Sequence, residues 1–255
     1  MKRIFWAIQA GFFYLFTLTA SCIPERFIPR AGRLIGLLLL RLLPGRRRIA
    51  VDNIRQALPF MKLHPAWSSS YETAEEIARE SFIHLGMSIV EICRLYHGKG
   101  DATINNIEVR GREHFDRARK KRQGLIFVGG HCGNWELMAL SFKRLFGEKM
   151  AGVARMQDNP YLNTVIERMR TGYDNQIFYK LGALRPILGM IKNNGVVGIL
   201  ADQAVFPEDG ALIDVLGRKA WANKAPVVIA NKSKVPLVAV FIHREGDRHV
   251  ITVFK

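Results

Sequence analysis

The chain has 255 residues and 49% of them are hydrophobic, so it can form one large α/β domain or two small ones around a sizeable core. Its 38 Lys and Arg against 22 Asp and Glu give a formal net charge of +16, which predicts an anionic partner. Short nucleic-acid-binding motifs are absent, so a membrane surface is favoured over nucleic acid. The three cysteines are odd in number and irregularly spaced, which argues against a disulfide framework and suits a reducing compartment. No metal or other cofactor is predicted.

The N-terminus predicts a membrane anchor. Met1–Arg3 precede an uncharged apolar run, Ile4–Ile23, and about 20 such residues span a ~30 Å hydrocarbon core. A cleaved signal peptide is the alternative, but Thr19-Ala20-Ser21-Cys22 lacks the Leu that a lipoprotein signal carries three residues before its Cys. We therefore expect residues 1–23 to be a transmembrane anchor. Seven arginines follow within Arg26–Arg48, so the positive-inside rule places the C-terminal bulk in the cytoplasm.

Residues 24–70 are predicted to be a basic, amphipathic membrane-docking segment followed by a linker. Leu34–Leu43 is too short to span and is bracketed by arginines, so it is either an interfacial segment or a buried helix of the main domain. Met61–Ser70 is polar and contains Pro65, as linkers often do. The main domain, residues 71–255, begins with Tyr71–His97, where apolar residues recur at three- and four-residue steps typical of a long amphipathic helix.

Strand and helix patterns alternate through the rest of the chain. This alternation predicts an α/β fold with a mostly parallel central sheet flanked by helices, whose active site lies beyond the carboxyl ends of the strands. The expected strands are Ile107–Val109, Leu125–Val128, Ala151–Ala154, Gln176–Tyr179, Val196–Leu200, Leu237–Ile242 and Val250–Phe254. The expected helices are Glu113–Lys121, Trp135–Phe146, Pro160–Thr171, Arg185–Lys192 and Ala220–Lys232.

The stretch GLIFVGGHCGNWELMAL, residues 124–140, carries the strongest candidate site. A buried strand ends at two glycines, and a helical pattern begins near Asn134. His131 therefore sits in the turn and Glu136 on the helix, so that both can face one site. A carboxylate bonded to an imidazole fixes its tautomer and stabilises the cation formed when the base takes a proton. Adjacent turn residues rarely point at each other, so Cys132 is interpreted as a small filler and not as a nucleophile.

This stretch resembles the lipid A late acyltransferase family, bacterial membrane enzymes that move a fatty acyl chain from a carrier thioester to a glycolipid hydroxyl. The resemblance implies His131 as general base, Glu136 as the group that orients it, and backbone N–H groups near Gly130 and Gly133 as oxyanion candidates. It also implies acyl-carrier protein as the donor, an anionic membrane glycolipid as the acceptor, and an inner-membrane enzyme facing the cytoplasm.

Three further blocks resemble the same family and supply candidate substrate-binding residues. AGVARMQDNPYL contains Arg155 and Asn159, and VIERMRTGY contains Arg168 and Arg170. Arginines near the site can hold phosphates or an oxyanion, although Arg168 and Arg170 also suit a solvated helix face. The block VVGILADQ ends in Asp202-Gln203, and Asp202 can orient His131, bind the acceptor or cap a loop.

Two alternative functions stay open at this point. Phe206–Gly210 superficially resembles a block of glycerolipid acyltransferases, which use the same kind of base, but the Thr-Arg continuation is missing. A non-catalytic membrane-bound scaffold of the same fold is the other alternative, because family members usually continue beyond the position of Lys255.

Overall fold

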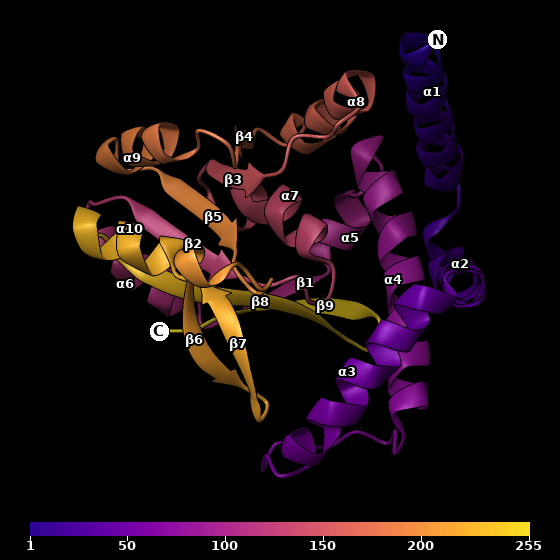
Figure 1. The fold of residues 1–255 in the computed structure, drawn as a ribbon. Helices are drawn as coiled ribbons and strands as arrows, with labels where there is room; N and C mark the ends of the chain where they lie inside the picture. The colour runs from indigo at the N-terminus through magenta and orange to yellow at the C-terminus, as the bar shows by residue number, and fades with distance from the viewer.

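A computed structural model describes all residues, 1–255, and shows an α/β fold built on a seven-stranded sheet (Figure 1). The strands lie in the order β1-β9-β8-β2-β5-β3-β4, and only the β8–β9 pair is antiparallel. The predicted class, a mostly parallel sheet flanked by helices, is confirmed. The strands are β1 (Ile107–Arg110), β2 (Leu125–Gly129), β3 (Met150–Ala154), β4 (Gln176–Tyr179), β5 (Val196–Leu200), β8 (Leu237–Glu245) and β9 (Arg248–Val253).

Helices cover both faces of the sheet because alternate side chains of each strand point to opposite faces. Leu125 and Phe127 of β2 join the larger core, with side chains from α6 (Arg112–Lys120) and α7 (Trp135–Phe146). Ile126, between them, joins a second core with α9 (Leu184–Lys192) and α10 (Ala225–Ser233). α5 (Asp101–Asn105) adds Ile104 to the larger core, and α8 (Pro160–Thr171) joins β3 to β4. The prediction of a buried strand before the two glycines is therefore confirmed.

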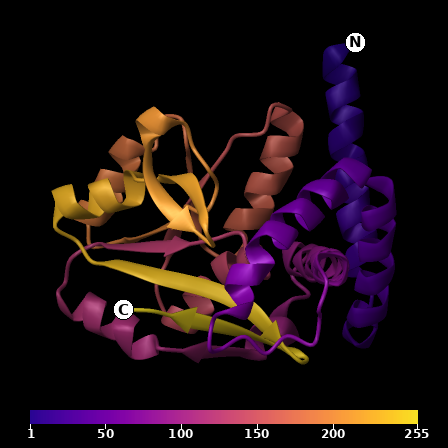
Figure 2. The ribbon, with the colours of Figure 1, turned by 60° about the horizontal axis from the view of Figure 1, so that its bottom comes forward.

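The first four helices gather on one side of the molecule in both ribbon views (Figures 1 and 2). They are α1 (Lys2–Ser21), α2 (Ile28–Leu42), α3 (Pro44–Lys62) and α4 (Ala74–Tyr96). α4 begins with a capping box in which the Thr73 and Glu76 side chains each bond the other residue's backbone N–H. α1 is the one helix that is long and apolar enough to cross a membrane.

α2 combines the two roles that the sequence left open. Its glycine face packs against α4, where a Cβ atom on Gly86 would lie 2.1 Å from the carbonyl oxygen of Gly32, so the two backbones touch closely. Its other face leaves large apolar side chains exposed, namely Leu34, Leu38 and Leu42. One helix thus serves as part of the fold and presents an apolar surface.

The predicted helix Ala220–Lys232 is wrong over its first part. A two-stranded antiparallel hairpin, β6 (Gly210–Val215) and β7 (Arg218–Asn223), occupies this region, and α10 begins only at Ala225. Leu216 and Gly217, which join the strands, both have positive φ (50° and 78°), as a two-residue hairpin turn requires. Pro226 lies in the first turn of α10, where its missing N–H costs no hydrogen bond.

Candidate active site

Sheet register brings His131 and Asp202 together. β2 and β5 are parallel neighbours, and Gly129 pairs with Leu200 at their carboxyl ends. Each of the two functional side chains follows its strand end by two residues, so both emerge at the same point of the sheet edge. Adjacent carboxyl ends are where sites form in sheets of this kind.

The His131 imidazole is held by Asp202. Its Nδ1 lies 2.7 Å from Oδ1 of Asp202, and the backbone N–H of His131 donates to Oδ2 at 2.8 Å. This fork favours the tautomer with the proton on Nδ1, which leaves the Nε2 lone pair free to accept a proton. The edge of the Trp135 ring lies against the imidazole, with the centroids 5.2 Å apart. Of the three roles considered for Asp202, the geometry favours orienting His131.

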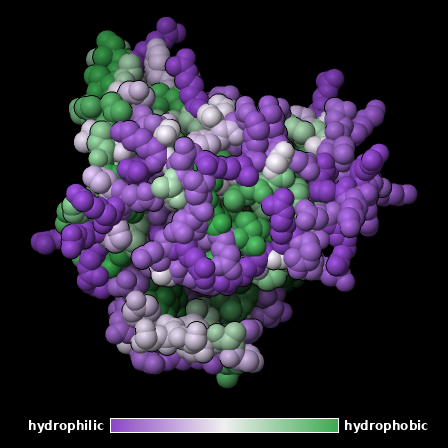
Figure 3. All heavy atoms as spheres, turned by 180° about the vertical axis from the view of Figure 1, so that it is seen from behind, coloured by the Kyte–Doolittle hydropathy of each residue, from purple (hydrophilic) through white to green (hydrophobic).

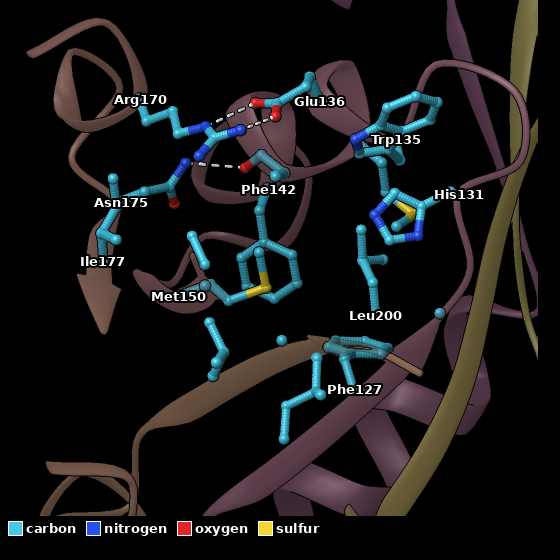
Figure 4. A pocket seen from close by; sticks show the side chains of 18 of the residues that line it. Phe127, His131, Trp135, Glu136, Phe142, Met150, Arg170, Asn175, Ile177 and Leu200 are labelled. Atoms are coloured by element: carbon cyan, nitrogen blue, oxygen red, sulfur yellow. Dashed lines mark hydrogen bonds and ion pairs between the residues drawn. The ribbon is translucent and has the colours of Figure 1, made fainter. Parts of the chain in front are cut away.

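Glu136 has partners other than the expected one. The Arg170 guanidinium donates to both carboxylate oxygens, with Nε at 3.1 Å from Oε2 (Figure 4). The Tyr96 hydroxyl donates to Oε2 at 3.4 Å. Burial lowers the pKa of Arg170, but the charge of Glu136 and its hydrogen bond outweigh it and raise that pKa above its usual value. The expected bond from Glu136 to His131 is absent because the first turn of α7 directs Glu136 toward α8.

A buried polar cluster around Glu91 holds the turn that carries His131 in place. Asn134 caps α7 by accepting a bond from the Leu137 N–H, and its Nδ2 donates to Glu91 of α4 at 2.9 Å. Glu91 also binds Arg244 at 2.5 Å and lies 3.1 Å from Nε2 of His249. Burial raises the pKa of Glu91, but these two partners outweigh it and hold the pKa below its usual range. An ionised, enclosed carboxylate thus supports the turn that carries His131.

The two glycines proposed for the oxyanion also have packing reasons to be glycine. A Cβ on Gly133 would lie 2.2 Å from the carbonyl oxygen of Ile242, and its φ of +55° disfavours other residues. A Cβ on Gly130 would lie 3.3 Å from the Asp202 side chain. Both glycines therefore let the turn pass close to β8 and to Asp202.

A cavity of about 600 Å³ opens beside His131 and runs between the sheet and α7 (Figure 4). Its inner part is apolar, lined among others by Phe127, Phe142, Phe146, Met150 and Ile177. Gly152 of β3 adds no side chain and leaves open space, whereas the space beside Gly198 of β5 is filled by the Met150 side chain. The Glu136–Arg170 pair forms part of the wall. A long apolar cavity with a base at one end suits a substrate with a hydrocarbon tail.

The structure brings some of the other predicted residues to the cavity and places others elsewhere. Arg155 and Gln203, which follow β3 and β5, line the cavity together with Arg170. Arg168 is exposed on α8 and does not line it, so the solvated-face interpretation fits this residue. Asn159 is buried as the N-cap of α8, away from the cavity, and its side chain contacts α1.

Cys132 lies next to His131 but lacks the features of a nucleophile. Burial, together with the nearby Asp202 charge, raises the pKa of its thiol, and hydrogen bonds offset this only in part. The thiolate is the reactive form, so a raised pKa suppresses it. Cys132 is exposed, so the structure does not show it filling the core, but the raised thiol pKa agrees with the expectation that it is not the nucleophile.

Several residues of the site were missed from the sequence. Lys180 follows β4 by one residue and lines the cavity mouth, a position that the strand-end rule points to. Asn175 lines the apolar part and donates to the Ala139 carbonyl at 2.8 Å. Tyr96 reaches Glu136 from α4, and no local pattern signals that contact.

A mostly parallel α/β sheet whose strand ends hold a carboxylate-oriented histidine beside a largely apolar cavity has the arrangement of an enzyme site that accepts a substrate with an apolar part. The model of the bacterial lipid A biosynthesis acyltransferase family matches residues 2–254, and the chain belongs to that family. It is 24% identical over 230 residues to the lipid A biosynthesis lauroyltransferase of Escherichia coli K12, covering 88% of this chain and 70% of the relative. It is 26% identical over 174 residues to the palmitoleoyltransferase of the same organism, covering 68% of this chain and 53% of the relative.

Proposed function

We propose that the protein transfers a fatty acyl chain from acyl-carrier protein to a hydroxyl of a membrane glycolipid of the lipid A type, at the cytoplasmic face of the inner membrane. The observation that carries the proposal is the His131–Asp202 pair at the mouth of the apolar cavity. Family membership supports the reaction class. The +16 charge suits both an acidic carrier protein and lipid phosphates.

In the proposed reaction, Nε2 of His131 takes the proton of the acceptor hydroxyl as its oxygen attacks the thioester carbonyl carbon. The tetrahedral intermediate then collapses, the carbon–sulfur bond breaks, and the imidazolium returns the proton to the leaving thiolate. Asp202 stabilises the imidazolium through Nδ1. A positioned base of this kind contributes about 10²–10⁴-fold to the rate.

The developing oxyanion needs a donor near His131. Backbone N–H groups of the turn around Gly130 and Gly133 are one source and the Arg155 guanidinium at the cavity mouth is another. Arg155 is largely exposed and pairs only with Asp158, its neighbour three residues along, so it is available to a substrate. Lys180, also at the mouth, adds a second cation for phosphate groups.

The acyl chain would occupy the apolar part of the cavity, past the Glu136–Arg170 pair. The Met150 side chain limits the free volume of the cavity near Gly198, because the Met150 sulfur would lie 2.8 Å from a Cβ on that glycine. Gly152, by contrast, has no atom within 4 Å of a Cβ position. Gly152→Leu should therefore narrow the cavity and favour shorter acyl donors.

A comparison of cellular lipids tests the reaction directly. Mass spectrometry of lipids from cells that produce the protein should show an additional acyl chain on a glycolipid, and cells producing His131→Ala should lack it. An additional chain on a glycerophospholipid would support the glycerolipid alternative. Lipids identical in the two strains would support the non-catalytic scaffold.

The donor is tested separately with isolated membranes. We expect transfer from an acyl-carrier-protein thioester to be faster than transfer from the matching CoA thioester at equal concentration. Rising salt should weaken the first reaction more strongly, because carrier docking on a basic surface is screened. Equal rates and equal salt dependence would remove the carrier protein from the proposal.

A further inference from the structure

One stripe of α1 is docked on the rest of the protein from Trp6 to Ser21. Its inward-facing residues recur every three to four positions, as one face of a helix does: Trp6, Ala10, Phe13, Thr17 and Ala20 are buried or half-buried. The helix packs against α4 and α8. A 20-residue helix is about 30 Å long, which is the thickness of a hydrocarbon core, so the docked stripe extends over most of the length that would cross a bilayer.

Polar groups of the domain bind α1 near its N-terminal end. The Asn159 amide, buried at the start of α8, donates to the Trp6 carbonyl at 2.9 Å and to Oε1 of Gln9 at 2.8 Å. Asp158, the residue before it, has a side chain that is 87% exposed, and Arg155 is 78% exposed. A charge in the centre of a bilayer costs at least about 2.5 kcal/mol, and these two charges lie beside the first turns of α1.

Polar groups also bind the other end of α1. Oγ1 of Thr17 lies 3.0 Å from Nε2 of His97, and Arg94 donates to the Ile23 carbonyl at 2.6 Å. Lys99 reaches Ser21 at 3.4 Å. If α1 crossed the bilayer in this position, polar side chains at both of its ends would have to cross with it.

The outward face of α1 is apolar and continues onto α2. Eight large apolar side chains on α1 are exposed: Ile4, Phe5, Ile8, Phe12, Tyr14, Leu15, Phe16 and Leu18. They form the apolar ridge that stands out at the top left in the view from behind (Figure 3). α2 lies on the same side of the molecule and exposes Leu34, Leu38 and Leu42, with the exposed arginines Arg30, Arg33 and Arg41 on the same helix. Apolar faces edged with arginine are typical of helices that lie in the head-group region of an anionic bilayer.

We infer that α1 lies along one surface of the membrane, with its outer stripe and that of α2 in the lipid, and does not cross the bilayer. The N-terminus then lies on the same side of the membrane as the α/β domain. This differs from the anchor expected from sequence, because hydropathy registers the length of an apolar run and not its docked face. The inference rests on the contacts of α1 and is independent of the proposed reaction.

Thiol labelling tests which side the N-terminus occupies. Single variants Lys2→Cys and Lys121→Cys, both at exposed positions, are treated with a membrane-impermeant maleimide in spheroplasts and in inverted inner-membrane vesicles. Peptide mapping separates these sites from the natural cysteines. We expect both positions to react in the same preparation, namely the inverted vesicles.

Reaction of the two positions in opposite preparations would overturn the inference, because it would place α1 across the bilayer. Reaction of Lys2→Cys only after detergent is added would overturn it too, since the N-terminus would then lie in the hydrocarbon. Reaction of both in spheroplasts would keep the docked helix and would instead contradict the cytoplasmic placement in the proposed function.

Cross-linking tests whether α1 stays docked in the membrane. The pair Gln9→Cys and Asn159→Cys should be joined efficiently by a short thiol cross-linker in membranes. Gly11→Cys with Asn159→Cys is the matched control, because Gly11 is exposed and has no atom within 4 Å of a Cβ position. Equal yields for the two pairs, or none for the first, would contradict docking.

Discussion

Two carboxylates flank the proposed catalytic turn, and their surroundings differ. Asp202 holds His131 at the open edge of the sheet, where its side chain is 42% exposed. Glu136 is 12% exposed and is bound by Arg170 in the wall of the cavity. Asp202 is placed to stabilise the charge that His131 would gain as the proposed base, while the charge of Glu136 is already balanced by Arg170. The proposed base is thus oriented by an acid distant in sequence and not by the acid five residues away.

The largest effect is expected at His131, because it is the proposed general base. His131→Ala should lower acyl transfer by at least about 10²-fold, since the general base is lost. The thermal midpoint should stay close to that of the natural protein, because the side chain lies at the open cavity mouth. Retention of more than a tenth of the activity would show that another group acts as the base.

A smaller effect is expected from weakening the partner of Glu136. Arg170→Lys keeps the charge and loses the planar fork that grips both oxygens, so activity should fall roughly tenfold and should not be fully restored. Arg168→Lys, two residues earlier on the exposed face of α8, is the control and should behave like the natural protein. Equal activity of the two variants would show that the planar fork of Arg170 does not contribute to acyl transfer.

Glu91, the buried carboxylate that binds Arg244 and His249, is expected to contribute to stability. Glu91→Gln leaves Arg244 and His249 without their shared carboxylate, so unfolding at pH 7 should become easier by about 1–3 kcal/mol. The folded pKa of Glu91 is depressed, so its contribution is complete above the unfolded value of about 4.3 and is lost as the pH falls through the folded pKa. Denaturant titrations should therefore show the difference between natural and variant protein shrinking in acid. Glu208→Gln, at an exposed position, is the control.

The smallest effect is expected at Cys132. Cys132→Ser should retain most of the activity, because the raised thiol pKa leaves little thiolate and the proposed hydroxyl attack is direct. Rate measurements and intact-mass analysis after incubation with the acyl donor check this. A stable acyl adduct on Cys132 would replace direct attack with a two-step mechanism.

The fold was largely predictable because its strands and helices are local patterns. Apolar runs such as Val196–Leu200 have one interpretation once they alternate with helices, and their carboxyl ends locate the site. The β6–β7 hairpin was missed because its alternation is weak and its turn, Leu216-Gly217, depends on positive φ in a non-glycine residue. Leu is an unusual choice there, so the sequence carries little signal.

The partners within the site were less predictable because they come from distant parts of the chain. Asp202 meets His131 through the register of two strands that are far apart in sequence. Spacing and the family resemblance paired His131 with Glu136, and neither contains information about Arg170 on another helix. Asn159 illustrates the same limit, because its position after a strand gives no sign that α1 returns to cover it.

The most direct test of the account compares the two carboxylates in a single experiment. Initial rates of acyl transfer are measured for Asp202→Asn and Glu136→Gln beside the natural protein, together with thermal midpoints. We expect Asp202→Asn to lose about 10²-fold in kcat with little change in stability, because the imidazolium loses its counter-charge. Glu136→Gln should lose less activity and more stability, because Arg170 is left unpaired in the cavity wall. Near-natural activity of Asp202→Asn, with Glu136→Gln as inactive as His131→Ala, would contradict the account and return Glu136 to the role of orienting the base.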